Sequence, residues 1–202
     1  MFGPLHEGQV QHVGNTPTFN LLPPVVDGFL GRAESMHAVI SLLSEHNIVT
    51  IKGLPGIGKT SLAKAVGNFL LDRNCFRDGV IYLSLRGCES LEMLVKRVAV
   101  QVLKKTLKEE AIPLNATESQ GGHFEDALEL CHTNLRDKHA LLILDNCEEI
   151  MIQDETGFKD FVSGFFAQYT AKVRLLLTSR TTLGAIEGIN ENVYQLRELS
   201  RR

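Results

Sequence analysis

The chain has 202 residues, 44% of them hydrophobic and 22% charged, which is enough for one sizeable core and some tail. Its formal net charge is −3, and its Lys and Arg residues do not gather into a long basic cluster, so the sequence carries no direct nucleic-acid signal. No apolar run approaches the roughly 18 residues of a membrane span, and the N-terminus has no signal-peptide pattern, so we expect no membrane association.

The four cysteines, Cys75, Cys88, Cys131 and Cys147, lie far apart and form no C-x-x-C pair. This spacing is typical of buried, reduced thiols rather than of a metal site or a disulfide framework. Reduced thiols indicate a reducing compartment, and we therefore expect the protein to be cytoplasmic.

The order of apolar patterns along the chain predicts the fold class. Residues 1–27 are rich in Gly, Pro, His, Gln and Asn without periodicity, which predicts a flexible N-terminal segment. In chain order we then expect a helix from residue 33, a strand at 48–51, a helix at 59–72, a strand at 80–85, a helix from 91, a long loop at 105–124, a helix at 125–136, a strand at 140–144, a helix at 158–169, and strands at 173–178 and 193–196. Strands that alternate with helices predict a parallel sheet covered by helices on both faces.

Residues 53–60 read Gly-Leu-Pro-Gly-Ile-Gly-Lys-Thr, which is the G-x-x-x-x-G-K-[ST] phosphate loop. Glycines let the backbone curl so that its N–H groups point inward around an anion. Lys59 can reach the β- and γ-phosphates, and the Thr60 hydroxyl can ligate Mg²⁺. The helix that follows Gly58 adds its positive end to the anion site. The motif therefore predicts a nucleotide-binding site.

A nucleotide site with a phosphate loop also needs an acidic residue for its Mg²⁺, and Asp145 is the candidate. It ends a wholly apolar strand, where its carboxylate would hold Mg²⁺ through water. Many NTPases place an acid at the next position, but here it is Asn146, which can orient a water but is not a base. Glu148 and Glu149 are nearby substitutes. The pattern favours a slow hydrolase or a switch over a fast motor.

Arg180 follows the strand predicted at 173–178. At the mouth of a parallel sheet an Arg points to where ligands bind. A guanidinium there can contact the γ-phosphate and so distinguish ATP from ADP. The alternative is a solvated Arg in a loop.

Four segments lie in the order and spacing of the NB-ARC domain, and the chain resembles this domain over about residues 27–199. They are Phe29–Glu34, the phosphate loop, Leu141–Glu148 and Leu177–Arg180. The NB-ARC domain belongs to the STAND class of AAA+-related signalling ATPases. The resemblance implies a three-layer α/β P-loop fold in residues 28–200. Its central parallel five-stranded sheet would have the order 2-3-4-1-5, with the phosphate-loop strand beside the sensor strand and helices on both sides.

The resemblance also implies a role for each residue of the site. Leu30 and Arg32 would lie against the adenine of ATP or ADP. Asp145 and Thr60 would serve Mg²⁺, and Arg180 would be the first sensor. Apart from the resemblance, the residues themselves make Glu148 a further catalytic candidate. The nucleotide would be bound by Gly53, Pro55, Gly56, Ile57, Gly58, Lys59, Thr60 and Ser61. The chain departs from the family pattern at Ala33, where an acid is common, and at Asn146.

The family pattern also predicts what lies beyond this domain. NB-ARC proteins continue into a helical domain and a winged-helix domain, so we expect the chain to be a fragment that lacks both. Protein partners would act through such C-terminal domains, and exchange of ADP for ATP would favour a nucleotide-dependent homo-oligomer. The alternatives are an AAA+-like ATPase motor acting on protein or nucleic acid, a small-molecule kinase with a lid at 105–124, and a non-binding scaffold.

Overall fold

The computed structural model describes residues 19–23, 31–106, 124–168 and 172–198. The strands are β1 (Phe19–Leu21), β2 (Ile48–Lys52), β3 (Gly79–Ser84), β4 (Ala140–Asp145), β5 (Arg174–Ser179) and β6 (Glu191–Gln195). The helices are α1 (Ala33–Glu45), α2 (Lys59–Asp72), α3 (Leu91–Thr106), α4 (Phe124–Leu135), α5 (Glu148–Gln153) and α6 (Glu155–Gln168). In the described residues, the six strands form one sheet that is parallel throughout, in the order β1-β3-β4-β5-β2-β6.

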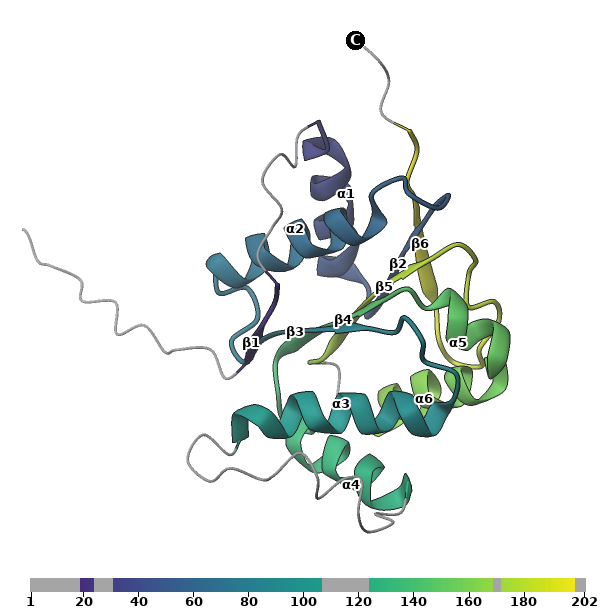
Figure 1. Ribbon diagram of the computed structural model, residues 1–202. Coiled ribbons are helices and arrows are strands. Elements are labelled where there is room, and N and C mark those ends of the chain that lie inside the picture. Colours follow the sequence, from purple (N-terminus) through teal and green to yellow (C-terminus); the bar gives the residue numbers. More distant parts are fainter. Residues whose placement is uncertain (1–18, 24–30, 107–123, 169–171, 199–202) are drawn as a thin grey trace, which may run out of the picture.

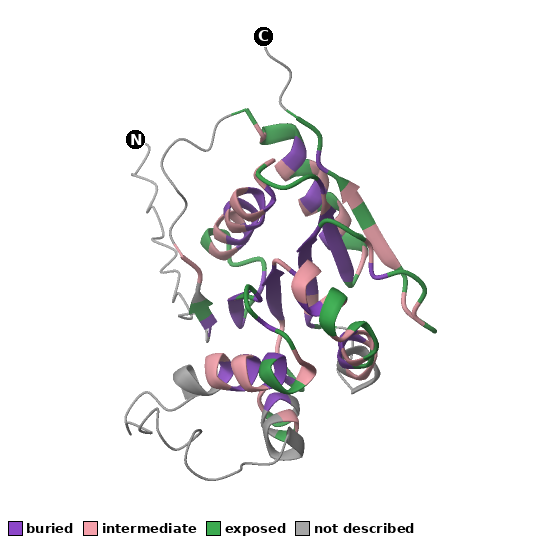
Figure 2. Cartoon of the chain, turned by 45° about the vertical axis from the view of Figure 1, so that its right-hand side comes forward, coloured by how far each residue is buried: buried purple, intermediate pink, exposed green. Residues whose placement is uncertain are grey.

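Helices cover both faces of this sheet, so the α/β three-layer arrangement is confirmed. In Figure 1, α1 and α2 lie above the sheet and α3 and α6 lie below it, with α4 packed beneath α3. Each face has its own apolar cluster. All six residues of β4 are buried, as Figure 2 shows for the strands at the centre of the molecule. A strand that is buried on both faces cannot alternate between apolar and polar residues, which explains the continuous apolar run from Ala140 to Leu144.

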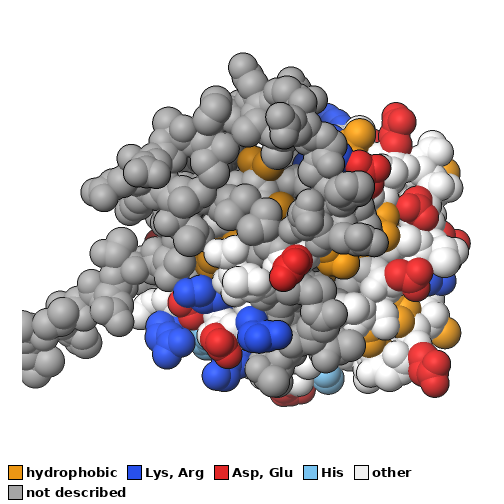
Figure 3. Space-filling view, turned by 90° about the horizontal axis from the view of Figure 1, so that it is seen from below, with side chains coloured by type: hydrophobic (Ala, Val, Ile, Leu, Met, Phe, Trp, Pro, Cys, Tyr) orange, Lys and Arg blue, Asp and Glu red, His pale blue; other side chains and the backbone are white. Residues whose placement is uncertain are grey.

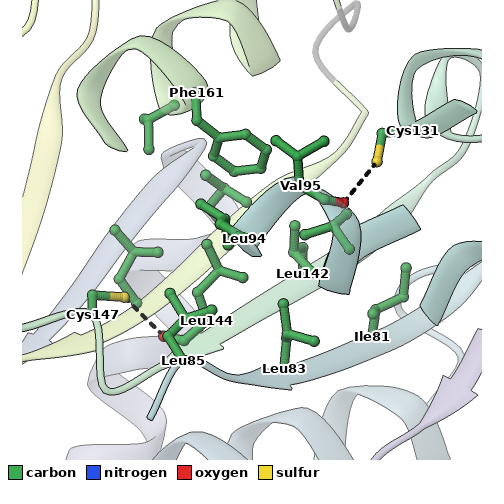
Figure 4. Close-up of a cluster of buried hydrophobic side chains, with 14 of the residues drawn as sticks. Ile81, Leu83, Leu85, Leu94, Val95, Cys131, Leu142, Leu144, Cys147 and Phe161 are labelled. Atoms are coloured by element: carbon green, nitrogen blue, oxygen red, sulfur yellow. Dashed lines mark hydrogen bonds between the residues drawn. The ribbon is translucent and has the colours of Figure 1, made fainter. Parts of the chain in front are cut away.

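The lower layer is an ordinary apolar core. Figure 4 shows Leu94 and Val95 of α3 beside Leu142 and Leu144 of β4, with Phe161 of α6 at the other side of the cluster. Each of these side chains is at most 5% exposed. At roughly 25 cal/mol for each Å² of apolar surface buried, such side chains supply most of the favourable free energy of folding. This core fixes the position of β4 and so of the acid at its end.

The predicted five-stranded sheet is wrong in its number of strands, because a sixth strand lies at its edge, whereas the other five, β3-β4-β5-β2-β6, follow the predicted order 2-3-4-1-5. That strand, β1, lies within residues 1–27, the segment interpreted as flexible. It pairs with the first half of β3, where Phe19 is opposite Gly79 and Leu21 is opposite Ile81. Phe19 is 1% exposed, so burial holds a strand that is too short to show a period. The phosphate-loop strand β2 lies beside β5, as expected.

Two further predictions need correction. The pattern of apolar residues does not predict α5, a single short helix that carries two acids in its first turn. The four cysteines are free but not all buried, because Cys75 is exposed while Cys88, Cys131 and Cys147 are buried. Residues 107–123, which make up most of the predicted loop, lie outside the described part of the chain. No described helix is both long and apolar enough to cross a bilayer.

We expect the edge strand β1 to depend on Gly79. This residue has φ +102°, and a Cβ atom there would lie 1.8 Å from the backbone oxygen of Phe19. Gly79→Ala should therefore lower the free energy of unfolding by about 3 kcal/mol, from left-handed strain plus overpacking. The matched control is Gly87→Ala, since Gly87 has φ +65° and an added Cβ would meet no described atom within 4 Å. It should cost only about 1 kcal/mol.

Urea unfolding followed by circular dichroism measures both values. Equal losses for the two variants would show that the close contact between β1 and Gly79 does not contribute to stability.

We expect one reactive thiol in the folded protein. Burial raises the pKa of the Cys131 thiol to about 12 and also raises the pKa of Cys88 and Cys147, so these groups stay protonated near neutral pH. Titration with a disulfide reagent at pH 8 should label Cys75 rapidly and the other three only after denaturation. The Cys75→Ser variant should then show no fast phase, and a remaining fast phase would contradict the burial of the other three.

Candidate phosphate-binding site

The phosphate loop connects the carboxyl end of β2 to the amino end of α2. Gly58 has φ +99° and is the N-cap residue of α2, a conformation that glycine adopts without steric cost. The N–H groups of the first helical turn have no partner within the helix and point toward the loop. A loop of this shape places backbone donors and the positive end of the helix around one point, which is what an anion requires.

Lys59 lies at the centre of this loop and is only 7% exposed. Its Nζ donates hydrogen bonds to the carbonyl oxygens of Gly53 (2.9 Å) and Leu54 (3.1 Å). Burial lowers the pKa of the Lys59 ammonium and Arg180 adds to this effect, whereas the carboxylates of Glu148 and Asp145 oppose it. The ammonium is thus held inside the loop, close to two acids and a second cation.

Asp145 is 3% exposed and accepts hydrogen bonds from three hydroxyl groups. Thr60 Oγ1 of α2 donates to both carboxylate oxygens, at 2.9 and 3.1 Å. Thr178 Oγ1 of β5 donates to Oδ1 (2.5 Å), and the Tyr82 hydroxyl of β3 donates to Oδ2 (2.7 Å). The acid predicted to serve the metal and the threonine predicted to ligate it are therefore in direct contact.

The donor set fits a magnesium ion shared with a nucleotide. Hydroxyl and carboxylate oxygens are the ligands that Mg²⁺ prefers, and it usually takes one or two carboxylates and fills its remaining positions with water and phosphate. Among the described residues, no group of three or more His, Cys, Asp or Glu side chains is arranged so that it could hold a metal ion. Thr60 and Asp145 would thus hold a metal together with phosphate oxygens rather than in a cage made only of protein.

Arg180 and Glu148 form an ion pair at the same edge of the sheet. The distance from Arg180 Nε to Glu148 Oε1 is 3.1 Å, and the side chains are 57% and 13% exposed, respectively. The second oxygen, Glu148 Oε2, is buried and has no hydrogen-bond partner among the described residues. The neighbouring Glu149 instead accepts a hydrogen bond from the backbone N–H of Gly87. Glu148 is therefore the acid that faces the site, and Glu149 holds the loop after β3.

Arg32 joins the phosphate loop to the segment that follows β6. Its guanidinium donates to the carbonyl oxygen of Ile57 (3.0 Å) and to that of Arg197 (2.5 Å). This places the Arg32 guanidinium at the phosphate loop, and its contact with the adenine stays a prediction. Leu30, its predicted companion, lies outside the described residues.

The remaining predicted residues follow the course of the loop. Gly53 is buried at the end of β2, where its N–H donates to the carbonyl of Ser179 (3.3 Å). Pro55 and Gly56 are exposed at the tip, Ile57 is half-buried, and Ser61 is half-buried in the first turn of α2. The structure therefore brings the described predicted residues together at one edge of the sheet, around Lys59.

Two polar residues of this cluster are not predicted from the sequence, namely the Asp145 partners Tyr82 and Thr178. Thr178 belongs to a recognised motif but has no role assigned in it. Tyr82 has a signal that can be seen afterwards, because it is a polar side chain within a β3 segment that is otherwise mostly apolar. Asn146 has φ +64°, and its backbone N–H donates to Thr178 Oγ1 (3.0 Å), so its backbone also supports the cluster.

A cavity of about 970 Å³ lies beside Tyr82, along the outer edge of β3 and beyond the three positions paired with β1. Its lining comes from the end of β3, from α3 and from Pro23, and includes Met93, Lys96 and Arg97. The phosphate loop does not contribute to it. The convergent polar groups around Lys59, rather than this cavity, thus define the candidate site.

Solved structures share this fold at low sequence identity. A Walker-type ATPase of Pyrococcus abyssi has a TM-score of 0.53 and 15% identity, and the match covers 88% of this chain and 57% of that one. A STAND protein with a tetratricopeptide repeat sensor from Pyrococcus horikoshii has a TM-score of 0.51 and 17% identity, covering 84% of this chain and 24% of that one. The Orc1 protein of Aeropyrum pernix, solved in complex with DNA, has a TM-score of 0.55 and 19% identity, covering 80% of this chain and 44% of that one.

The chain therefore corresponds to between about a quarter and about a half of the length of these proteins. No match is found among curated proteins. A family model, described as Novel STAND NTPase 1, matches residues 25–189, which is most of the chain. The expected STAND class is confirmed by this match, while the likeness to the NB-ARC domain stays a resemblance. The chain belongs to the Novel STAND NTPase 1 family and is a nucleotide-binding P-loop ATPase domain of the STAND class.

Proposed function

We propose that this domain is the nucleotide switch of a STAND-type signalling or regulatory protein, in which ADP holds the resting state and exchange for ATP favours assembly. The supporting observation is the cluster of Lys59, Asp145, Glu148 and Arg180 around one phosphate loop. A nucleotide shifts a two-state balance only by binding one state better than the other. A side chain that meets the γ-phosphate but not the β-phosphate provides such a difference, and Arg180 is the candidate.

Each residue of the site would bind a different part of the nucleotide. The phosphate loop and Lys59 would hold the phosphates, and Arg32 would contact the nucleotide from the N-terminal side. Thr60 and Asp145 would hold Mg²⁺, and the metal would supply positive charge that stabilises the phosphates. Protein partners would bind through domains outside this chain, and the assembly would be a homo-oligomer.

Hydrolysis would be slow and would depend on Glu148. Its buried Oε2 has no hydrogen-bond partner in the described part of the chain, and a carboxylate can take a proton from an attacking water. The same side chain is paired to Arg180, so it is held by the sensor rather than free to act. Glu148 must leave this ion pair before it can act as a base, so hydrolysis would be slow, as a switch requires.

The alternative is an AAA+-like motor that acts on nucleic acid or protein. The fold likeness to a structure that contains DNA, that of Aeropyrum pernix Orc1, favours this reading. The charges on one described face count against a motor that acts on nucleic acid. On the described part of the lower face, Lys and Arg side chains gather on one side with acids among them, and acids are scattered over the other side (Figure 3). A nucleic-acid motor needs a continuous basic surface.

The first test is to denature the purified protein and identify the released nucleotide by chromatography. We expect ADP from the wild type and none from Lys59→Ala, because losing hydrogen bonds from a charged donor weakens binding about 10- to 100-fold. Lys96→Ala is the matched control, since Lys96 is paired to Glu92 on α3 (2.6 Å). An empty wild type that hydrolyses added ATP faster than about 1 s⁻¹ would support the motor instead.

The second test is single-turnover hydrolysis of ATP. Glu148→Gln keeps the size of the side chain but removes the base and its pairing charge, and should lower the rate about 100-fold. Asn146→Ala should have a smaller effect, because an amide only orients water. Glu155→Gln, an exposed acid of α6 paired to Lys159, is the control and should not change the rate. If neither Glu148→Gln nor Asn146→Ala changes it, the assignment of the water-positioning residues is wrong.

A further inference from the structure

The carboxylate of Asp145 is held from both sides of its strand. β4 lies between β3 and β5 in the sheet, and each neighbour contributes one hydroxyl. Tyr82 of β3 donates to Oδ2 (2.7 Å), and Thr178 of β5 donates to Oδ1 (2.5 Å). Because each oxygen accepts a hydrogen bond from a different neighbouring strand, rotation of the carboxylate about its Cβ–Cγ bond would break at least one of these bonds. The orientation of the acid is therefore fixed by its two neighbouring strands.

This arrangement leaves the carboxylate facing the phosphate loop. Thr60 Oγ1 lies 2.9 and 3.1 Å from the two oxygens, so both present an acceptor direction toward α2. We propose that Tyr82 is a positioning residue of the magnesium site, whose hydroxyl holds Asp145 in the orientation that serves a metal bound at Thr60. This inference rests on the proposed function, because it assigns a residue to the metal half of the same nucleotide site.

Tyr82 is suited to this role because its hydroxyl points at Asp145 and its ring is held in place. The ring packs against the apolar cluster on the α1 and α2 side of the sheet. The Nζ of Lys64 lies 5.2 Å from the centre of the ring, which is within range of a cation–π contact.

The expected size of the effect follows from other metal sites. Side chains that hydrogen-bond a metal ligand orient it, and their loss typically lowers metal affinity about 10- to 100-fold. Tyr82→Phe removes the hydroxyl and keeps the ring, so the packing and the contact with Lys64 remain. The variant should therefore bind Mg²⁺ more weakly without losing the phosphate loop.

The experiment measures the affinity of the 202-residue chain for ADP, by titration calorimetry, with EDTA and at a series of Mg²⁺ concentrations. In wild type, Mg²⁺ should strengthen binding. In Tyr82→Phe, we expect the Mg²⁺ concentration for half of this effect to rise about 10-fold or more, with affinity in EDTA within about 2-fold of wild type. Tyr194→Phe, which removes a hydroxyl from the edge strand β6, is the matched control and should behave as wild type.

Coupling to Asp145 separates positioning from a general loss of structure. In an Asp145→Asn background, Tyr82→Phe should cause little further change, because the group on which it acts is already altered. Tyr82→Leu provides a second variant without the hydroxyl. The Mg²⁺ response is compared for the variant whose circular dichroism spectrum matches that of wild type.

The outcomes distinguish the two levels of the proposal. If wild type binds ADP and responds to Mg²⁺ but Tyr82→Phe responds identically, Tyr82 has no positioning role and the proposed function stands. Equal weakening in EDTA and in Mg²⁺ would likewise overturn the inference, since a structural defect acts on both. If wild type binds no ADP under either condition, the proposed function fails and the inference fails with it.

Discussion

The parallel register of β2, β4 and β5 is the constraint on which the site depends. Lys52 is opposite Ser179, and Leu144 is opposite Leu177, so the three strands end at one edge. The residue that follows each strand then emerges beside the other two. Because the side chains of all three strands pack into the apolar clusters on the two faces, a slip of one residue would move each side chain into the cluster on the other face and disrupt the packing. The core therefore sets the distances within the site, although most site residues belong to loops and helix ends.

Charges of both signs meet at this edge before any ligand is considered. Lys59 and Arg180 provide two cations, and Asp145 and Glu148 provide two carboxylates, of which Glu148 pairs directly with Arg180. Lys59 bonds neutral carbonyl oxygens of its own loop. A phosphate group would exchange those neutral acceptors for charged ones, which form stronger hydrogen bonds. It would also compete with Glu148 for Arg180, so phosphate binding and the state of the acid are linked by ordinary electrostatics.

Sequence patterns anticipated the parts of the site that are local in the chain. The phosphate loop, Asp145 and Arg180 are each recognised from a few adjacent residues and the strand before them, and the structure places them together. What the patterns missed depends on contacts between distant segments. β1 is held by the burial of Phe19 and by the absence of a side chain at Gly79, and neither appears as a period. Tyr82 becomes part of the site only through the pairing of β3 with β4. Adjacent acids in one helical turn look equivalent in sequence, and only the fold directs one of them toward the site and the other to Gly87.

The double hydrogen bond of Arg32 has a mechanical consequence. One guanidinium spans the phosphate loop at Ile57 and the backbone at Arg197, which lies 165 residues from Arg32 in the sequence. The planar group is rigid, so the two carbonyl oxygens cannot move apart by more than a fraction of an ångström while both bonds persist. If the phosphate loop moves, the backbone at Arg197 must therefore move with it, or one of the two hydrogen bonds must break. The Arg32 side chain thus transmits a small movement of the phosphate loop to the segment that follows β6.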